Sequence, residues 1–208
     1  LSNHIPLFGL PRYDFLFLSA LLLQIILYAT GIETKDEIKT IFGFHLIGLA
    51  LELYKTSAWV GSWSYPEFGY LKIGTVPLYS GFMYAAVGSY IAQAWRIFDL
   101  KLTGYRSYFW SVALCIAIYL NFFTNHFLPD ERIVLIPIVF VFFWETWVHF
   151  TVIEGKPRKM PLNLAFLLIA FFIWIAENIS TFFGAWKYPN QIHAWSVVST
   201  NKITSWFH

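Results

Sequence analysis

Long apolar stretches constrain this chain more than any other feature of its sequence. Such stretches cover residues 13–30, 41–60, 76–96, 107–123, 133–153 and 162–183. Each comes close to the roughly 17 to 25 residues that a helix needs to cross a bilayer core. Only 12% of the residues are charged, whereas a soluble domain carries about 25%. The sequence therefore predicts an all-α polytopic transmembrane helical bundle of six or more spans, formed as a single domain over residues 1–208.

The two ends of the chain predict that it belongs to a longer protein. It begins with Leu1, and the residues before Arg12 lack the basic start and the cleavage site of a signal peptide. Residues 191–208 are amphipathic, so we expect them to form an interfacial segment or the start of a further span.

Composition also excludes several classes of function. The net charge of +2, without a basic run interleaved with aromatic residues, argues against a nucleic-acid partner. A single cysteine, Cys115, excludes a disulfide framework. The six histidines include no H-x-x-H or H-x-x-x-H pair, so we expect neither a metal nor another cofactor.

The distribution of Lys and Arg predicts the orientation in the membrane. Alternate loops near residues 33–39, 96–106 and 154–160 hold eight basic residues, and the loops on the other side hold five. Basic residues favour the cytoplasmic side, so we expect these three loops to be cytoplasmic in a multi-pass protein of the inner, or plasma, membrane.

Ionisable side chains within the apolar stretches are the strongest functional signal. A charged group at mid-membrane costs about 2.5 to 3.5 kcal/mol, so such residues usually face a bundle interior. His45 and Glu52 lie seven residues apart in the second stretch, and Glu177 is followed by Asn178 in the sixth. We predict catalytic roles for Glu52, Glu177 and His45. The alternative is a structural polar network, such as Glu52 with Lys55 one helical turn along.

A second polar cluster is predicted from Glu145, His149, Asn125 and His126. The first two are spaced i, i+4, which would place them on one face of a helix.

The motif W-x-Y-P occurs twice, each time after a glutamate. Trp63 and Tyr65 in one copy are 123 residues from Trp186 and Tyr188 in the other. The pattern suggests a parallel internal repeat, with a site between its halves. The alternative is an interfacial aromatic belt, in which the proline ends the helix.

Five runs of the sequence are distinctive: R-Y-D-F-L at Arg12, F-H-L-I-G-L-A-L-E-L-Y-K at Phe44, G-S-W-S-Y-P-E at Gly61, V-P-L-Y-S-G-F-M-Y-A-A-V-G-S-Y at Val76 and A-E-N at Ala176. These runs resemble a family of bacterial multi-spanning membrane proteins, the domain-of-unknown-function family 817. The resemblance covers nearly the whole chain and implies no activity.

More distantly, the acidic helix followed by G-x-W-x-Y and a proline-led helix is similar to the repeat of membrane lycopene cyclases and carotenoid hydratases. The cyclases carry P-x-E-E, whereas this chain has Pro77-Leu78-Tyr79-Ser80. The resemblance implies a pocket for a long apolar molecule, with Glu52 and Glu177 as acid and base. Its lining is expected from Trp63, Tyr65, Tyr84, Asn178, Trp186 and Tyr188.

Two functional hypotheses follow. In the first, the protein binds or modifies an isoprenoid, carotenoid-like or lipid molecule by acid/base chemistry. In the second, it is a non-enzymatic accessory subunit of a larger membrane complex, or a small proton-coupled carrier. The expected partners are the lipid bilayer, a hydrophobic isoprenoid or pigment ligand, and other membrane subunits.

Overall fold

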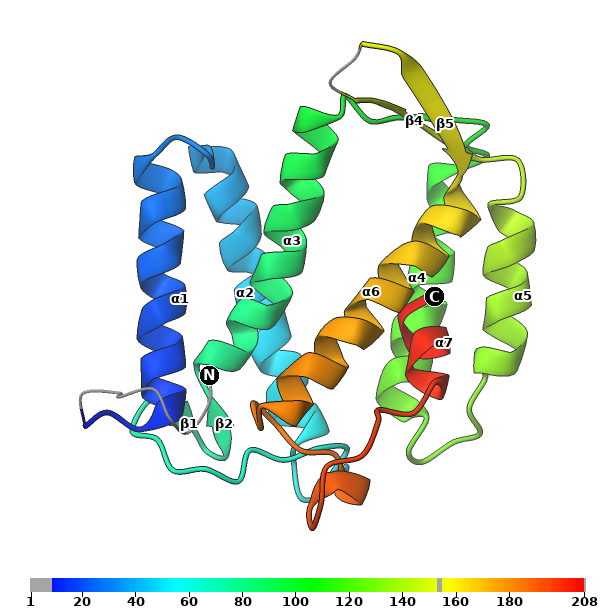
Figure 1. The fold of residues 1–208 in the computed structure, drawn as a ribbon. Helices are drawn as coiled ribbons and strands as arrows, with labels where there is room; N and C mark the ends of the chain where they lie inside the picture. Colours follow the sequence, from blue (N-terminus) through cyan, green and yellow to red (C-terminus); the bar gives the residue numbers. More distant parts are fainter. Residues whose placement is uncertain (1–8, 153–154, 208) are drawn as a thin grey trace. The chain divides into compact units, whose positions relative to one another are not determined.

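The computed structural model describes residues 9–152 and 155–207, which form two compact units (Figure 1). The first unit comprises the chain up to Trp95 together with Ser180–Ser196. The second comprises Arg96–Ile179 and the residues from Val197 onward.

The first unit is built on α1 (Arg12–Ala29), α2 (Lys35–Lys55) and most of α3 (Tyr79–Ile97). Two-residue strands β1 (Lys72–Ile73) and β2 (Val76–Pro77) pair antiparallel before α3, and a 3-10 turn, η1, spans Pro189–Gln191. Helix α2 begins with a capping box: the Glu37 backbone N–H donates to Thr34 Oγ1, and the Thr34 N–H donates to the Glu37 carboxylate. These reciprocal bonds satisfy donors that a helix start leaves open.

Arg12 ties the start of α1 to two distant segments of the first unit. Its guanidinium forms an ion pair with Glu67 and donates to the carbonyl oxygens of Phe183, at 2.6 Å, and Gly184. The neighbouring Asp14 carboxylate accepts the backbone N–H groups of Tyr70 and Leu71, both at 2.8 Å. Arg12 and Asp14 both bind residues that follow α2. The segment after α2 therefore lies beside the N-terminal end of α1.

Helices α2 and α3 pack closely through glycines. A Cβ atom added at Gly48 of α2 would lie 2.7 Å from Tyr84 Cβ, and one added at Gly81 of α3 would lie 2.7 Å from the His45 carbonyl oxygen. Both distances are too short for a real side chain, so the absence of a side chain permits the approach.

The second unit holds α4 (Tyr108–Thr124), α5 (Arg132–Phe142), most of α6 (Leu162–Phe182) and α7 (Asn201–Phe207). Its sheet has the order β3-β4-β5, all antiparallel, formed by Lys101–Thr103, Trp147–Thr151 and Pro157–Pro161. The register pairs Leu102 with Val148, and Val148 with Met160.

The predicted bundle of six or more membrane spans is wrong. Within the described residues there are seven α-helices and two small sheets, and two of the helices, α1 and α6, are long and apolar enough to cross a membrane. Helix α2 carries charged residues at both ends and Glu52 within, and α3 is interrupted by glycine, serine and glutamine. These residues lower the apolar character that a span requires.

The largest error concerns residues 133–153. Helix α5 ends at Phe142, and the run Trp147–Thr151 is strand β4. With 11 residues, α5 is about 17 Å long, shorter than the roughly 30 Å of a bilayer core. The run W-V-H-F-T is aromatic and β-branched, and such residues suit a strand that has partners on both sides. Near the chain's end, the amphipathic 191–208 segment contains the seven-residue helix α7.

Candidate functional site

A buried carboxylate on α2 organises the polar interior of the first unit. Glu52 is 2% exposed. Its Oε2 atom accepts hydrogen bonds from Trp63 Nε1 and from the Tyr65 hydroxyl, both at 2.7 Å. Its Oε1 atom accepts the Tyr84 hydroxyl at 2.9 Å. The structure thus joins Glu52 to three side chains predicted for the pocket, and we call these four residues the Glu52 cluster.

Aromatic rings surround the Glu52 cluster on the side of α1 and α3. The Tyr65 ring meets Tyr13 and Tyr79 edge to face, each with ring centroids 6.0 Å apart. Burial, reinforced by the neighbouring Glu52 carboxylate, raises the pKa of the Tyr65 phenol well above its usual value. Tyr65 therefore stays protonated and remains a hydrogen-bond donor to Glu52.

The two W-x-Y-P turns lie side by side. Their central residues, Ser64 and Lys187, form an antiparallel bridge in which each backbone N–H donates to the other's carbonyl oxygen, at 2.9 and 3.0 Å. The Trp63 and Tyr188 rings meet edge to face at 6.2 Å. Trp186 and Tyr188 are each 7% exposed. The two copies of the motif therefore build one structural element, which an interfacial belt does not require.

His45 lies two helical turns before Glu52 on α2, about 10 Å along the helix axis. Its ring packs against Phe82 of α3, with centroids 4.5 Å apart, and its Nδ1 atom is buried without a hydrogen-bond partner. The hydrogen bonds of the Glu52 carboxylate described above do not include His45. Its catalytic role stays a prediction.

Glu177 and Asn178 belong to the second unit. Glu177 is 7% exposed on α6. The Asn178 side chain accepts the Val198 N–H at 2.9 Å and donates to the Trp174 carbonyl oxygen at 2.8 Å. Asn178 thus fixes the segment that leads into α7. The pairing of Glu52 with Glu177 across a shared pocket also stays a prediction.

Glu145 and His149 do not lie on a helix. Glu145 precedes strand β4 and forms an ion pair with Arg106 at 2.9 Å, and His149 on β4 has its Nε2 atom 2.8 Å from Thr103 Oγ1. Asn125 and His126 directly follow α4. Strand β4 pairs with β3, which precedes α4, and Glu145 binds Arg106 just before that helix. The structure therefore places the two pairs at opposite ends of α4, which is about 26 Å long.

Sequence analysis missed a second buried carboxylate in the first unit. Glu33 is 2% exposed and accepts hydrogen bonds from Gln24 of α1 and from Ser89 and Gln93 of α3. The sequence predicts a charged loop at Glu33, because Lys35, Asp36 and Glu37 follow it closely. The signal that could have identified it is Gln24, a lone polar residue in an apolar helix.

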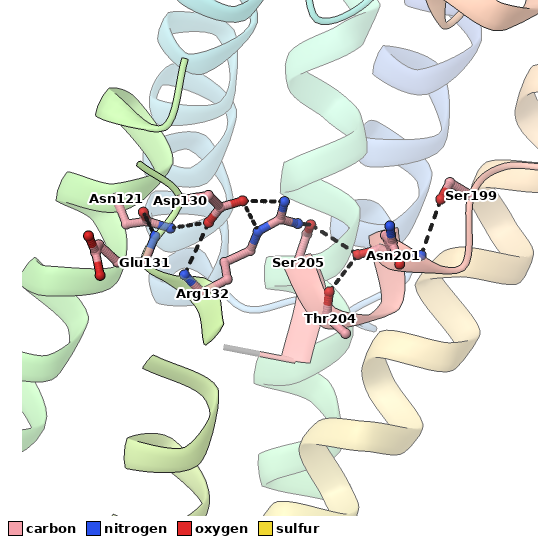
Figure 2. A network of polar contacts seen from close by, with 8 residues as sticks. All are labelled: Asn121, Asp130, Glu131, Arg132, Ser199, Asn201, Thr204 and Ser205. Carbon is pink, nitrogen blue, oxygen red and sulfur yellow. Dashed lines mark hydrogen bonds and ion pairs between the residues drawn. The ribbon is translucent and has the colours of Figure 1, made fainter. Parts of the chain in front are cut away.

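The second unit contains a polar network that joins α4, α5 and α7 (Figure 2). Asp130 accepts hydrogen bonds from Arg132 Nε at 2.6 Å and from Asn121 Nδ2 at 3.2 Å. The Arg132 guanidinium also donates to the Ser205 hydroxyl on α7. The side-chain hydrogen bond from Arg132 is the largest cause that lowers the pKa of Asp130, to about 2.

This network predicts an acid-dependent loss of stability. The folded pKa of Asp130 is about 2, below the roughly 3.9 of an unfolded aspartate. Its contribution is therefore fully present above about pH 4 and is lost as the pH falls through about 2. Unfolding measured against pH should show the stability difference between wild type and Asp130→Asn shrinking across that window. A constant difference would contradict the assignment.

In the described part of the chain, no group of three or more His, Cys, Asp or Glu residues is placed to hold a metal ion. Two hollows, of about 340 and 450 Å³, lie along α4 and between α4 and α5, lined mainly by apolar side chains such as Leu120. Both belong to the second unit.

Fold and site together define a mainly helical protein that has, in the part of the chain the structure describes, two helices able to cross a membrane and a buried carboxylate that accepts three hydrogen bonds. The family described as "Protein of unknown function (DUF817)" matches residues 2–208, and the chain belongs to this family. The chain is 58% identical over 206 residues to "Uncharacterized protein YoaT" of Bacillus subtilis (strain 168), covering 99% of this chain and 77% of that protein. No solved structure matches the chain.

Proposed function

We propose that this protein is a non-enzymatic integral membrane component, an accessory subunit in which Glu52 joins helices and acts on no substrate. The observation that carries this proposal is the occupation of both Glu52 oxygens by three donors from the protein, at 2.7 to 2.9 Å. A general acid or base must come within hydrogen-bond reach of the reacting group. A side chain that is 2% exposed and bonded to three protein donors suits a structural role better.

Membrane insertion is supported by the surfaces of α1 and α6. In their apolar windows, 11% and 22% of the residues are buried, whereas the core helix of a soluble domain would be mostly buried. Exposed side chains include Leu22 at 59% and Phe172 at 64%. Lipid tails would cover such faces without cost.

The contacts of Arg12 support a multi-pass arrangement in the inner membrane. Basic loops near 33–39 and 154–160 follow α1 and precede α6, so both loops belong on the cytoplasmic side, together with 96–106. Arg12 at the opposite end of α1 binds the carbonyl oxygens of Phe183 and Gly184, directly after α6. Both ends then lie on the outer side.

Labelling of introduced cysteines tests this arrangement. In a Cys115→Ser background, Lys39→Cys is expected to react with a membrane-impermeant maleimide only in opened cells, and His193→Cys is expected to react in intact spheroplasts. Both native side chains are exposed. Equal labelling of both positions in intact spheroplasts, or recovery of the protein in the soluble fraction, would refute the proposal.

A second candidate is the binding of an isoprenoid or pigment. The aromatic rings around Glu52, including Tyr13, Tyr65 and Tyr79, favour it, because such rings can stabilise a developing cation. Organic extraction of the purified protein, followed by mass spectrometry and absorption spectroscopy, decides between the two. A stoichiometric polyene or lipid that Trp63→Ala releases would favour this second candidate.

A further inference from the structure

Basic side chains gather on the three-stranded sheet of the second unit. Two of them are neutralised, Lys101 by Asp99 at 2.7 Å and Arg106 by Glu145 at 2.9 Å. Arg158 and Lys159 are exposed on strand β5. Lys156 stands exposed just before this strand. Successive side chains of a strand point to opposite faces, so Arg158 lies on one face of the β4–β5 hairpin and Lys159 on the other. The hairpin is therefore positively charged on both sides, and we call its three exposed basic residues, Lys156, Arg158 and Lys159, the β5 basic face.

Aromatic side chains lie on the same sheet as the β5 basic face and at the start of α4. The Lys159 ammonium lies 4.6 Å from the centroid of the Trp147 ring on β4. The first turn of α4, which follows β3 at the other edge of this sheet, exposes Tyr108, Phe109 and Trp110 at 79%, 71% and 62%. Tryptophan and tyrosine beside basic residues are typical of the headgroup layer of a membrane.

The hairpin continues directly into a candidate membrane helix. Strand β5 ends at Pro161 and α6 begins at Leu162, and Figure 1 shows the hairpin extending from that end of the helix. If α6 spans the bilayer, as in the proposed function on which this inference rests, Arg158 and Lys159 lie within four residues of its hydrocarbon boundary. At about 3.3 Å per extended residue, their backbone then lies at most about 10–13 Å from this boundary, and long basic side chains can reach back to the lipid phosphates.

We propose that the β5 basic face binds the phosphate groups of anionic lipids, of the phosphatidylglycerol class, in the cytoplasmic leaflet. Each basic residue near the surface adds attraction to an anionic leaflet. Lys and Arg differ here in geometry: Arg158 can bind two phosphate oxygens through its planar fork, and Lys159 acts as a point charge. A zwitterionic lipid offers the same phosphate without the net charge, so it should bind more weakly.

Native mass spectrometry of the detergent-purified full chain tests this binding. Titration with phosphatidylglycerol, and in parallel with phosphatidylcholine, gives lipid bound per chain. Arg158→Gln combined with Lys159→Gln should weaken phosphatidylglycerol binding by about 30-fold and weaken phosphatidylcholine binding by a smaller factor. The wild-type affinity for phosphatidylglycerol should also fall with rising salt.

A matched control removes the same charge elsewhere. Lys35→Gln combined with Lys39→Gln also lowers the net charge by two, in a segment where Glu33, Asp36 and Glu37 already outnumber the basic residues. This control should retain wild-type lipid binding. Equal loss in both double variants, or no loss in the β5 variant, would overturn the proposal. Because the assay counts bound lipid in detergent, its result is separate from the cysteine labelling that tests membrane insertion.

Discussion

Replacing Glu52 with leucine is expected to lower the free energy of unfolding by about 3–5 kcal/mol. The substitution removes the acceptor of three hydrogen bonds, so the buried Tyr65 hydroxyl and the half-buried donors of Trp63 and Tyr84 lose their bonds to Glu52. Each buried polar group left unsatisfied costs about 1–3 kcal/mol, partly offset by relaxation. Unfolding in a mixed-micelle denaturant titration measures the loss.

Two further variants test whether the loss of stability comes from the hydrogen bonds of Glu52. Glu131→Leu makes the same chemical change at an exposed position whose side chain does not cap α5, so its effect should stay within about 0.5 kcal/mol. Glu52→Gln keeps the shape and one oxygen, and it should fall between wild type and Glu52→Leu. If Glu52→Leu unfolds like wild type, Glu52 does not hold the first unit together, and the proposed structural role is wrong.

Part of the Glu52 cluster can be predicted from the sequence, because Glu52 and the W-x-Y-P turn after it lie close together in the chain. A glutamate in an apolar helix must find donors, and the W-x-Y-P turn that follows supplies an indole and a phenol within a short stretch. Tyr84 lies on α3 and also donates to Glu52, a contact that no local pattern in the sequence specifies. The local pattern therefore accounts for the bonds of Trp63 and Tyr65 to Glu52, whereas the bond of Tyr84 depends on how α3 packs against α2.

The wrong predictions concern segments whose local sequence is compatible with more than one structure. The run from Trp147 to Thr151 is apolar enough for a membrane helix, and only its pairing with β3 and β5 makes it a strand. In the sequence, Glu33 reads as part of a charged loop. In the structure, Gln24 of α1 and Ser89 of α3 donate hydrogen bonds to its carboxylate. Such outcomes depend on contacts between residues far apart in the chain, which a periodic pattern does not encode.

The glycine contacts between α2 and α3 predict the second large effect. Gly48→Ala should destabilise the protein by about 1–3 kcal/mol, because the new methyl group would overlap the Tyr84 side chain near its Cβ atom. Gly43→Ala is the matched control on the same helix: a Cβ atom there has nothing within 4 Å. That substitution should stabilise the helix by about 0.5–1 kcal/mol. The two alanine variants are thus expected to shift the unfolding midpoint in opposite directions.

A double-mutant cycle shows whether the effect of Gly48→Ala passes through the Glu52 cluster. Tyr84→Phe alone removes the hydroxyl that donates to Glu52 Oε1 at 2.9 Å, and it should cost about 1.5–3 kcal/mol as a bond to a charged acceptor. If Gly48→Ala already displaces Tyr84, then Tyr84→Phe should cost much less in that background. Strict additivity would mean that the methyl group is accommodated by a shift of the helices, with the Tyr84–Glu52 bond intact. Close glycine packing and the buried carboxylate would then be independent supports of the first unit, instead of two parts of one contact.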